Sequence, residues 1–280
     1  MKTRLIILFS LATLACGNAT NNNEKLQKTT EEIINKKGNT LEKRINCPEG
    51  FERKTAELSS FAYYLRNLPL KPDGEKVKYF NGLNKYNEVY VAVVDLPISN
   101  KDLHQCADAV MRLRAEYLYA IKAYEKISFT LTNGFKVDYA EWINGNRIVV
   151  NGNKTTWKKT ANASNTYKDF GSYLELIYTY AGTLSLSKSL KTKKINEISI
   201  GDVLIKGGSP GHAVIVVDMA VNKAGEKVFL LAQSYMPAQE TQILKNPKNE
   251  KLSPWYKLSE IKNDIITPEW DFTVDQLKTW

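Results

Sequence analysis

The chain has 280 residues, a formal charge of +9 at pH 7, 43% hydrophobic residues and three cysteines. This length is enough for one large domain with a substantial core. Apart from a short cluster at Lys188, Lys191, Lys193 and Lys194, the basic residues are scattered along the sequence. Because a nucleic-acid-binding protein needs a basic stripe or a recognition motif, we expect no nucleic acid among the partners.

Residues 1–15 have the features of a signal peptide. Lys2 and Arg4 precede a short apolar run at 5–12, which is too short to span a bilayer as an ordinary transmembrane helix. Thr13-Leu14-Ala15-Cys16-Gly17 then resembles a bacterial lipobox, which implies a lipid on Cys16. The expected product is an exported, membrane-anchored lipoprotein that faces the periplasm or the cell surface. Because Thr13 departs from the usual leucine, simple cleavage after Ala15 is the alternative.

The rest of the chain divides into a tether and one domain. Residues 16–44 carry the lipid anchor and are rich in Asn, Lys, Glu and Thr with almost no apolar periodicity, so they predict a flexible tether. A single domain is expected over 45–280. Its first elements are a helix around 55–67, from the helical spacing of apolar residues, and a buried strand over 88–95, from a β-branched run.

The clearest predicted helix follows Asp102. With Asp102 as N-cap and Gln105 three places on, the sequence forms a capping box, and apolar residues keep one face for about twenty residues. Counting back by four from Val110 places Cys106 on that face, near the helix N-terminus. Free N–H groups and the helix dipole lower the pKa of a thiol there and can stabilise an oxyanion. The alternative is that Cys106 is a small, inert core residue.

Turn signals at Asn133-Gly134, Asn144-Gly145 and Asn151-Gly152 then separate short strands, and a further helix is predicted around Tyr173–Tyr180. Residues 200–205 form a strand, and a Gly-rich link leads to His212, which opens a second, apolar strand. The chain returns as a third strand over 227–235. Both long strands are apolar on both faces, which is typical of central strands in a covered sheet.

His212 is one of only two histidines and the strongest candidate for a base. If Val221 faces Glu226 in the hairpin, His212 lies opposite Tyr235, with Gln233 and Ser234 beside it. An amide at this place would hold the imidazole in one tautomer, as the third member of a catalytic group does. The alternative is a strand-end histidine that is satisfied by the adjacent loop.

Two further interpretations compete for the cysteine. In an exported protein, Cys47 and Cys106 are candidates for a structural disulfide, which would leave no free thiol. A metal site built from His104, Cys106 and His212 is disfavoured, because positions i and i+2 on a helix diverge by about 200°. We therefore predict neither a metal nor a cofactor and expect His104 at the surface or the edge of a cleft. The tail, 247–280, is predicted to wrap the surface.

These motifs together resemble the papain-like cell-wall hydrolases, namely the NlpC-type peptidases and the CHAP amidases. Gly201-Asp202-Val203 and His212-Ala213-Val214-Ile215 match the two stretches around the histidine in those families. Gln105-Cys106 is similar to the CHAP nucleophile, and Ala232-Gln233-Ser234 sits where CHAP proteins carry an acidic and an amide residue. The stretch from Gln105 to Tyr117 also looks like a hallmark of an uncharacterised family of exported Bacteroidetes lipoproteins.

The resemblance implies an α+β fold with a papain-like core, in which the nucleophile helix packs on an antiparallel sheet. Because the Cys–His interval is longer than usual, it also implies that 127–195 is an inserted segment. It further implies a cysteine hydrolase, an amidase or peptidase, that acts on peptidoglycan peptides. In it Cys106 is the nucleophile, His212 the base, and Gln233 or Ser234 the residue that orients the imidazole. The alternative is a non-catalytic lipoprotein that binds glycan, peptide or a protein partner on the same fold.

Overall fold

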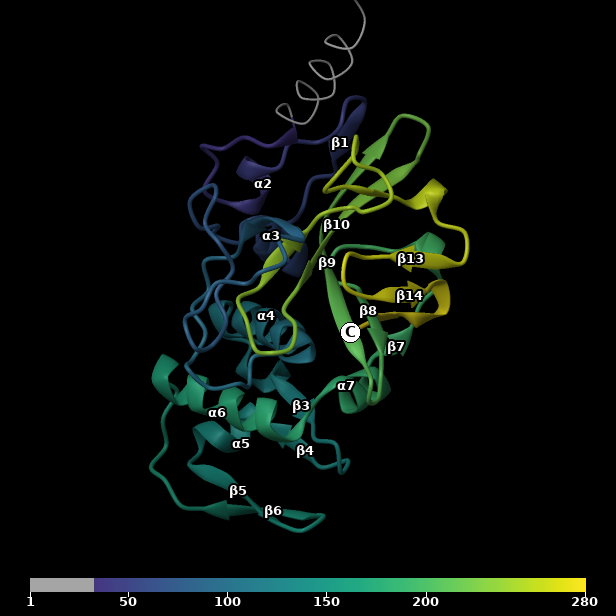
Figure 1. Ribbon diagram of the computed structural model, residues 1–280. Helices are drawn as coiled ribbons and strands as arrows, with labels where there is room; N and C mark the ends of the chain where they lie inside the picture. The colour runs from purple at the N-terminus through teal and green to yellow at the C-terminus, as the bar shows by residue number, and fades with distance from the viewer. Residues whose placement is uncertain (1–32) are drawn as a thin grey trace, which may run out of the picture.

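The computed structural model describes residues 33–280, so the predicted signal peptide and the predicted lipidation site Cys16 lie outside the described residues. The centre is an antiparallel sheet in the order β2-β11-β10-β9-β8-β15-β7, with β1 paired to β9 and β12 paired to β10 (Figure 1). Its strands are β1 (Phe51–Arg53), β2 (Tyr90–Val93), β7 (Lys191–Thr192), β8 (Val203–Lys206), β9 (His212–Asn222), β10 (Lys227–Gln233), β11 (Gln242–Leu244), β12 (Tyr256–Lys257) and β15 (Leu277–Thr279).

Helices and three small hairpins surround this sheet, so the predicted α+β class is confirmed. The α-helices are α2 (Leu41–Arg44), α3 (Phe61–Arg66), α4 (Cys106–Ala120), α5 (Tyr139–Ile143), α6 (Tyr167–Tyr180) and α7 (Thr183–Ser189). The hairpins pair β3 (Ser128–Thr130) with β4 (Lys136–Asp138), β5 (Asn146–Asn151) with β6 (Lys154–Lys159), and β13 (Asp264–Ile266) with β14 (Asp271–Thr273). Among residues 33–280, no helix is long and apolar enough to cross a membrane.

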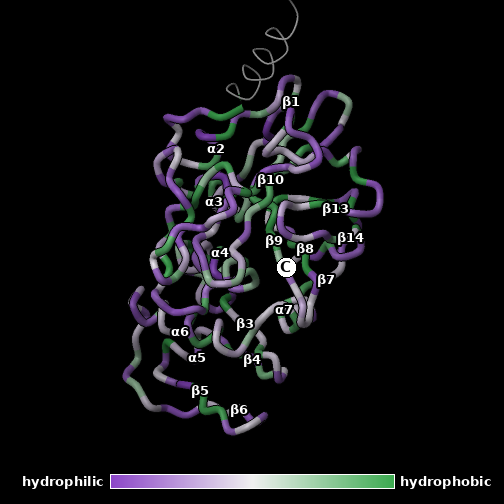
Figure 2. The backbone as a smooth tube through the Cα atoms, in the orientation of Figure 1, coloured by the Kyte–Doolittle hydropathy of each residue, from purple (hydrophilic) through white to green (hydrophobic). Residues whose placement is uncertain are grey.

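The sheet is covered on both faces, as its apolar strands predict. Figure 2 shows β8, β9 and β10 as the hydrophobic centre of the molecule. On one face, Ala213, Ile215 and Val217 of β9 belong to a core shared with α4. The alternate residues Val214 and Val216 face a second core, which includes Phe229, Leu231 and Phe272. This alternation fixes which face of β9 packs against α4.

The hairpin register differs from the prediction near its turn and agrees with it near the site. Lys227, where Glu226 was expected, pairs with Val221. An irregularity between Leu230 and Leu231 then shifts the pairing by one residue, so that Leu231 faces Val216. A β-bulge of this kind adds one residue on one strand. The predicted register is therefore restored before the chain reaches Gln233.

Two parts of the chain are more ordered than their composition indicates. Within the predicted tether, residues 33–44 are folded: Leu41 is fully buried, and an isolated bridge joins Ile34 to Ile45. The tether prediction is therefore wrong for 33–44. The tail does not merely wrap the surface either. Trp255 and Leu277 are fully buried, and β15 pairs with β8 in the central sheet.

The segment predicted as an insertion, 127–195, forms its own group of elements at one end of the molecule. It holds β3 to β6, α5, α6 and α7, which lie in the lower part of Figure 1. Its last strand, β7, pairs with β15 and so joins the central sheet at its edge. Its buried residues, among them Phe170, Tyr173 and Leu186, belong to the same hydrophobic core as α4, so the segment packs against the rest of the domain through side chains as well as through β7.

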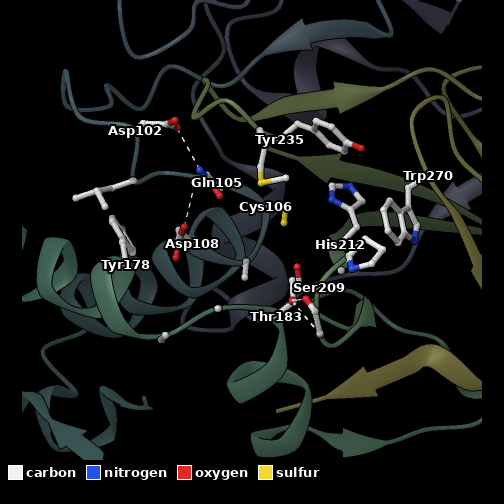
Figure 3. A pocket seen from close by; sticks show the side chains of 18 residues that line it. Asp102, Gln105, Cys106, Asp108, Tyr178, Thr183, Ser209, His212, Tyr235 and Trp270 are labelled. Atoms are coloured by element: carbon white, nitrogen blue, oxygen red, sulfur yellow. Dashed lines mark hydrogen bonds between the residues drawn. The ribbon is translucent and has the colours of Figure 1, made fainter. Parts of the chain in front are cut away.

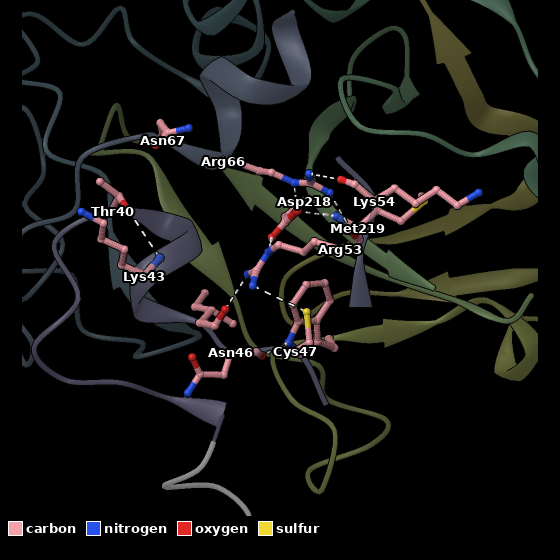
Figure 4. Close-up of polar contacts among 12 residues, drawn as sticks. Thr40, Lys43, Asn46, Cys47, Arg53, Lys54, Arg66, Asn67, Asp218 and Met219 are labelled. Carbon is pink, nitrogen blue, oxygen red and sulfur yellow. Dashed lines mark hydrogen bonds and ion pairs between the residues drawn. The ribbon is translucent and has the colours of Figure 1, made fainter. Parts of the chain in front are cut away.

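A buried carboxylate ties the first part of the domain to β9 (Figure 4). Asp218 is fully buried, and its two oxygens accept hydrogen bonds from Arg53 Nε and Arg66 Nε, both at 2.6 Å. Arg66 also donates to the carbonyl oxygens of Lys54 and Met219. Arg53 donates to the sulfur of Cys47 at 3.5 Å. Asp218 therefore connects β1 and α3 to the strand that carries His212 at its other end.

Candidate active site

The start of α4 and the start of β9 meet at a cavity of about 330 Å³ (Figure 3). We call it the Cys106 cavity. Cys106 and His212 both line it, although they are remote in the sequence. Its other polar and aromatic side chains are Asp102, Gln105, Asp108, Tyr178, Thr183, Ser209, Tyr235 and Trp270. Two predicted site residues, the nucleophile and the base, are therefore brought to one place.

Cys106 is the first residue of α4, so the helix begins three residues later than an N-cap at Asp102 would give. The N-cap is Gln105, whose backbone N–H donates to Asp108 Oδ2 at 3.0 Å. Asp102 instead accepts from the backbone N–H of Ala238 at 2.6 Å, which holds residues 101–104 outside the helix. The prediction of Asp102 as N-cap is wrong, but the placement of Cys106 in the first turn is confirmed.

The sulfur of Cys106 lies next to the backbone of β9. Burial raises the pKa of the thiol, and backbone groups of Ala213, the residue after His212, and of Ala107 and Cys106 itself lower it by a smaller amount. Free N–H groups in a first helical turn have no intrahelical acceptor and can hold an oxyanion. Cys106 is 7% exposed, so a small substrate group can reach it while bulk water is largely excluded.

His212 is placed by a close backbone approach before β9. A Cβ atom on Gly211 would lie 2.5 Å from both Gly208 O and Thr183 Oγ1, so only glycine fits there. The imidazole is 1% exposed, and it lies among the rings of Tyr235, Trp270 and Phe272, with centroids at 4.8, 5.5 and 5.8 Å. The ring is therefore rigidly held in the wall of the Cys106 cavity.

Gln233 fixes the tautomer of His212, in the position that the sequence predicts for an orienting amide. His212 Nε2 lies 2.8 Å from Gln233 Oε1, while Gln233 Nε2 donates to Glu269 Oε2 at 2.6 Å. Because the Glu269 carboxylate only accepts, the Gln233 amide must present its oxygen to the imidazole. His212 Nε2 then carries the proton, which leaves Nδ1 with a free lone pair.

Glu269 and Lys85 complete this network, and neither was predicted as a site residue from the sequence. Lys85 Nζ donates to both Glu269 oxygens at 2.8 and 2.7 Å and to Gln239 Oε1 at 2.8 Å. Burial lowers the pKa of Lys85, and its contact with Glu269 opposes this. The chain Lys85–Glu269–Gln233–His212 joins segments that are far apart in the sequence. Glu269 and its neighbour Trp270, which lines the cavity, both come from the tail.

Burial dominates the electrostatics of the candidate pair. It raises the pKa of the Cys106 thiol to about 11, against the lowering by nearby backbone N–H groups, and lowers the pKa of His212 to about 4. The expected lowering of the thiol pKa by the helix N-terminus is therefore wrong, because desolvation is the larger effect. At neutral pH the resting pair is a neutral thiol and a neutral imidazole, so deprotonation must accompany attack.

Alkylation of Cys106 by iodoacetamide is expected to be slow at pH 7 and to accelerate about tenfold per pH unit up to about pH 10, following the thiolate fraction. Peptide mapping by mass spectrometry after timed labelling measures the rate at Cys106 separately from that at Cys47. A fast rate at pH 6 that does not change with pH would mean a resting thiolate–imidazolium pair and would contradict this electrostatic description.

Ser234 and His104 lie beside the site and do not face the imidazole. The Ser234 hydroxyl donates to His104 O at 2.9 Å and Gln239 O at 2.7 Å, so it fixes the segment before α4. It does not orient His212, which was the role predicted for it. His104 is 3% exposed, and its Nδ1 lies 3.2 Å from Gln239 O. His104 is therefore not a surface residue, although it lines a cavity between α4 and α6.

The competing interpretations of the cysteines and of a metal site are not supported by the fold. Cys47 and Cys106 are both free thiols, so the proposed disulfide between them is absent from this structure. His104 lines a different cavity, between α4 and α6, so it does not converge with Cys106 and His212. Within residues 33–280, no group of three or more His, Cys, Asp or Glu side chains is arranged to hold a metal ion.

Comparisons with known proteins add the family but no activity. Neither the curated proteins nor the solved structures contain a significant match to this chain. A family model described as a domain of unknown function, DUF4846, matches residues 41–279, which include all of the Cys106 cavity. The chain belongs to the DUF4846 family.

Proposed function

We propose that this protein is a cysteine hydrolase of the cell envelope that cleaves amide bonds in the peptides of peptidoglycan. In this proposal residues 1–15 direct export, a lipid on Cys16 anchors the protein to the membrane, and the core is papain-like. The single observation that carries the proposal is the meeting of Cys106 and His212 in one cavity, with Gln233 holding the imidazole tautomer. A nucleophile, a base and an orienting group are what this chemistry requires.

The proposed reaction uses the neutral resting pair. His212 Nδ1 takes the thiol proton as Cys106 Sγ bonds to the carbonyl carbon, and the tetrahedral oxyanion accepts from backbone N–H groups at the start of α4. His212 then gives the proton to the leaving amine as the C–N bond breaks. Water hydrolyses the resulting thioester, with His212 as base, and returns the free thiol. Burial of the site strengthens each of these interactions relative to water.

The proposal is tested by incubating the purified protein with muropeptides of defined stem peptides and following the products by mass spectrometry. We expect the wild-type protein to release shorter peptides and Cys106→Ala to release none. Cys47→Ala is the matched control, because Cys47 is a free thiol that does not line the cavity, and it should retain wild-type rates. Cleavage by Cys106→Ala at the wild-type rate, or no cleavage by the wild-type protein, would contradict the proposal.

The burial of Cys106 and its raised pKa also favour a second candidate, a lipoprotein that binds envelope peptides or glycans without cleaving them. In that case muropeptides should bind to the wild-type protein and to Cys106→Ala with equal affinity in calorimetry, and no product should form. Turnover by the wild-type protein excludes this second candidate.

A further inference from the structure

Two buried polar atoms of the Cys106 cavity have no partner within the protein. They are Asp108 Oδ1 and Tyr178 Oη. Both residues line the cavity, and Asp108 is only 6% exposed. A buried polar group without a hydrogen bond costs about 1–3 kcal/mol. Native proteins rarely leave such groups unpaired, so a cluster of them in a cavity indicates a ligand or an ordered water.

One carboxylate oxygen of Asp108 accepts a hydrogen bond within the protein, and the other has no partner there. Its Oδ2 accepts from the backbone N–H of Gln105, which stabilises the first turn of α4. The other oxygen is directed away from Gln105, on the side of the cavity where Tyr178 lies (Figure 3). His212 and Trp270 lie on the far side of Cys106 in the same view. The unpartnered atoms therefore flank the thiol on the side away from the base.

The charged side chains that line the cavity itself favour a cation, although Lys85 and Lys206 lie behind the rings of Tyr235 and Trp270. Although the chain has 39 Lys and Arg residues, none of them lines the cavity within residues 33–280, whereas Asp102 and Asp108 do. A primary ammonium group has three donors and no acceptor, which matches a carboxylate oxygen and a tyrosine hydroxyl. Burial raises the pKa of the Asp108 carboxyl to about 8. A bound ammonium group beside it favours the ionised carboxylate, and the carboxyl proton is then released to solvent.

We propose that substrates of the Cys106 site carry a free primary amine close to the cleaved bond, and that Asp108 and Tyr178 bind it. This inference rests on the proposed hydrolase function and specifies its substrate class. The amine comes either from the peptide N-terminus or from the side chain of a diamino acid. Asp108 and Tyr178 are then specificity-determining residues, since they contact the substrate beside the reacting carbonyl.

The test compares four versions of one stem peptide, with both amines free, with the N-terminus acetylated, with the side chain acetylated, and with both acetylated. For the wild-type protein, we expect double acetylation to lower kcat/KM by about 10- to 100-fold, the effect of losing a charge-assisted hydrogen bond. The two singly acetylated peptides show which amine is bound. Asp108→Asn keeps an oxygen that can accept from the backbone N–H of Gln105. This variant should cleave the free peptide as slowly as the wild-type protein cleaves the doubly acetylated peptide.

A binding measurement separates failure of this inference from failure of the hydrolase proposal. In calorimetry with Cys106→Ala, the free peptide should bind about 10- to 100-fold more tightly than the doubly acetylated peptide. The difference should disappear in Cys106→Ala combined with Asp108→Asn, and Tyr178→Phe should reduce it. If wild type cleaves and Cys106→Ala binds both peptides equally, the two atoms hold only water and the amine inference is wrong. If no peptide is cleaved but this preference persists, the amine site stands without the hydrolase.

Discussion

Replacing His212 by alanine is expected to lower kcat/KM for peptide cleavage by about 10²- to 10⁴-fold, the usual contribution of a general base. The thiol pKa of about 11 makes the effect large, because Cys106 has almost no thiolate at neutral pH without a proton acceptor. Initial rates at pH 7 over a range of substrate concentrations measure the loss. Circular dichroism and the unfolding midpoint check that the variant is folded.

The activity of Gln233→Ala should be measured beside that of His212→Ala, because the Gln233 variant is expected to show a smaller loss. It keeps the imidazole but removes the acceptor at 2.8 Å that fixes its tautomer. Its loss of activity should therefore be smaller than that of His212→Ala and should fall mainly on kcat, since Gln233 does not line the cavity and acts on the reaction through His212. Wild-type rates in His212→Ala, or a larger loss in Gln233→Ala than in His212→Ala, would contradict the assigned roles.

Asp218→Ala is expected to destabilise the domain by about 3–5 kcal/mol, the typical cost of removing one partner of a buried ion pair while the other stays buried. The variant leaves the guanidinium groups of Arg53 and Arg66, with side chains 14% and 5% exposed, without their counter-charge. It also removes one side-chain contact that joins β1 and α3 to β9, although the backbone pairing of β1 with β9 remains. Urea unfolding followed by tryptophan fluorescence measures the change in the free energy of unfolding.

Glu88→Ala is the matched control for Asp218→Ala. Glu88 pairs with Lys76 at 3.1 Å, but the two side chains are 55% and 54% exposed. Exposed pairs of this kind contribute about 0–1 kcal/mol because water screens them. Equal unfolding midpoints for Asp218→Ala and the wild-type protein would mean that the buried cluster is not a stabilising contact.

The sequence predicted the parts of the site that depend on local pattern. Cys106 at a helix start followed from apolar spacing, and His212 at the start of a buried strand followed from a Gly-rich link before a β-branched run. Gln233 was found because hairpin pairing is a local rule, and the bulge at Leu230/Leu231 compensated a one-residue error at the turn.

The parts that depend on long-range packing were not predictable. Glu269 and Lys85 are 184 residues apart, and no periodicity connects them to His212. Ile33 and Leu41 stand in a mostly polar stretch, so composition indicated a tether although both are buried. The thiol pKa was misjudged for a related reason. The helix N-terminus is visible in the sequence, whereas the burial that outweighs it is a property of the whole fold.

The claim on which the rest depends is that the Cys106 sulfur is a nucleophile activated by His212. Its most direct test is covalent trapping with a stem-peptide chloromethyl ketone, followed by intact-mass measurement and peptide mapping. We predict one adduct per chain, on Cys106, formed at least about tenfold more slowly in His212→Ala at pH 7. An adduct on another residue, or equal rates of labelling in His212→Ala and the wild-type protein, would contradict the claim.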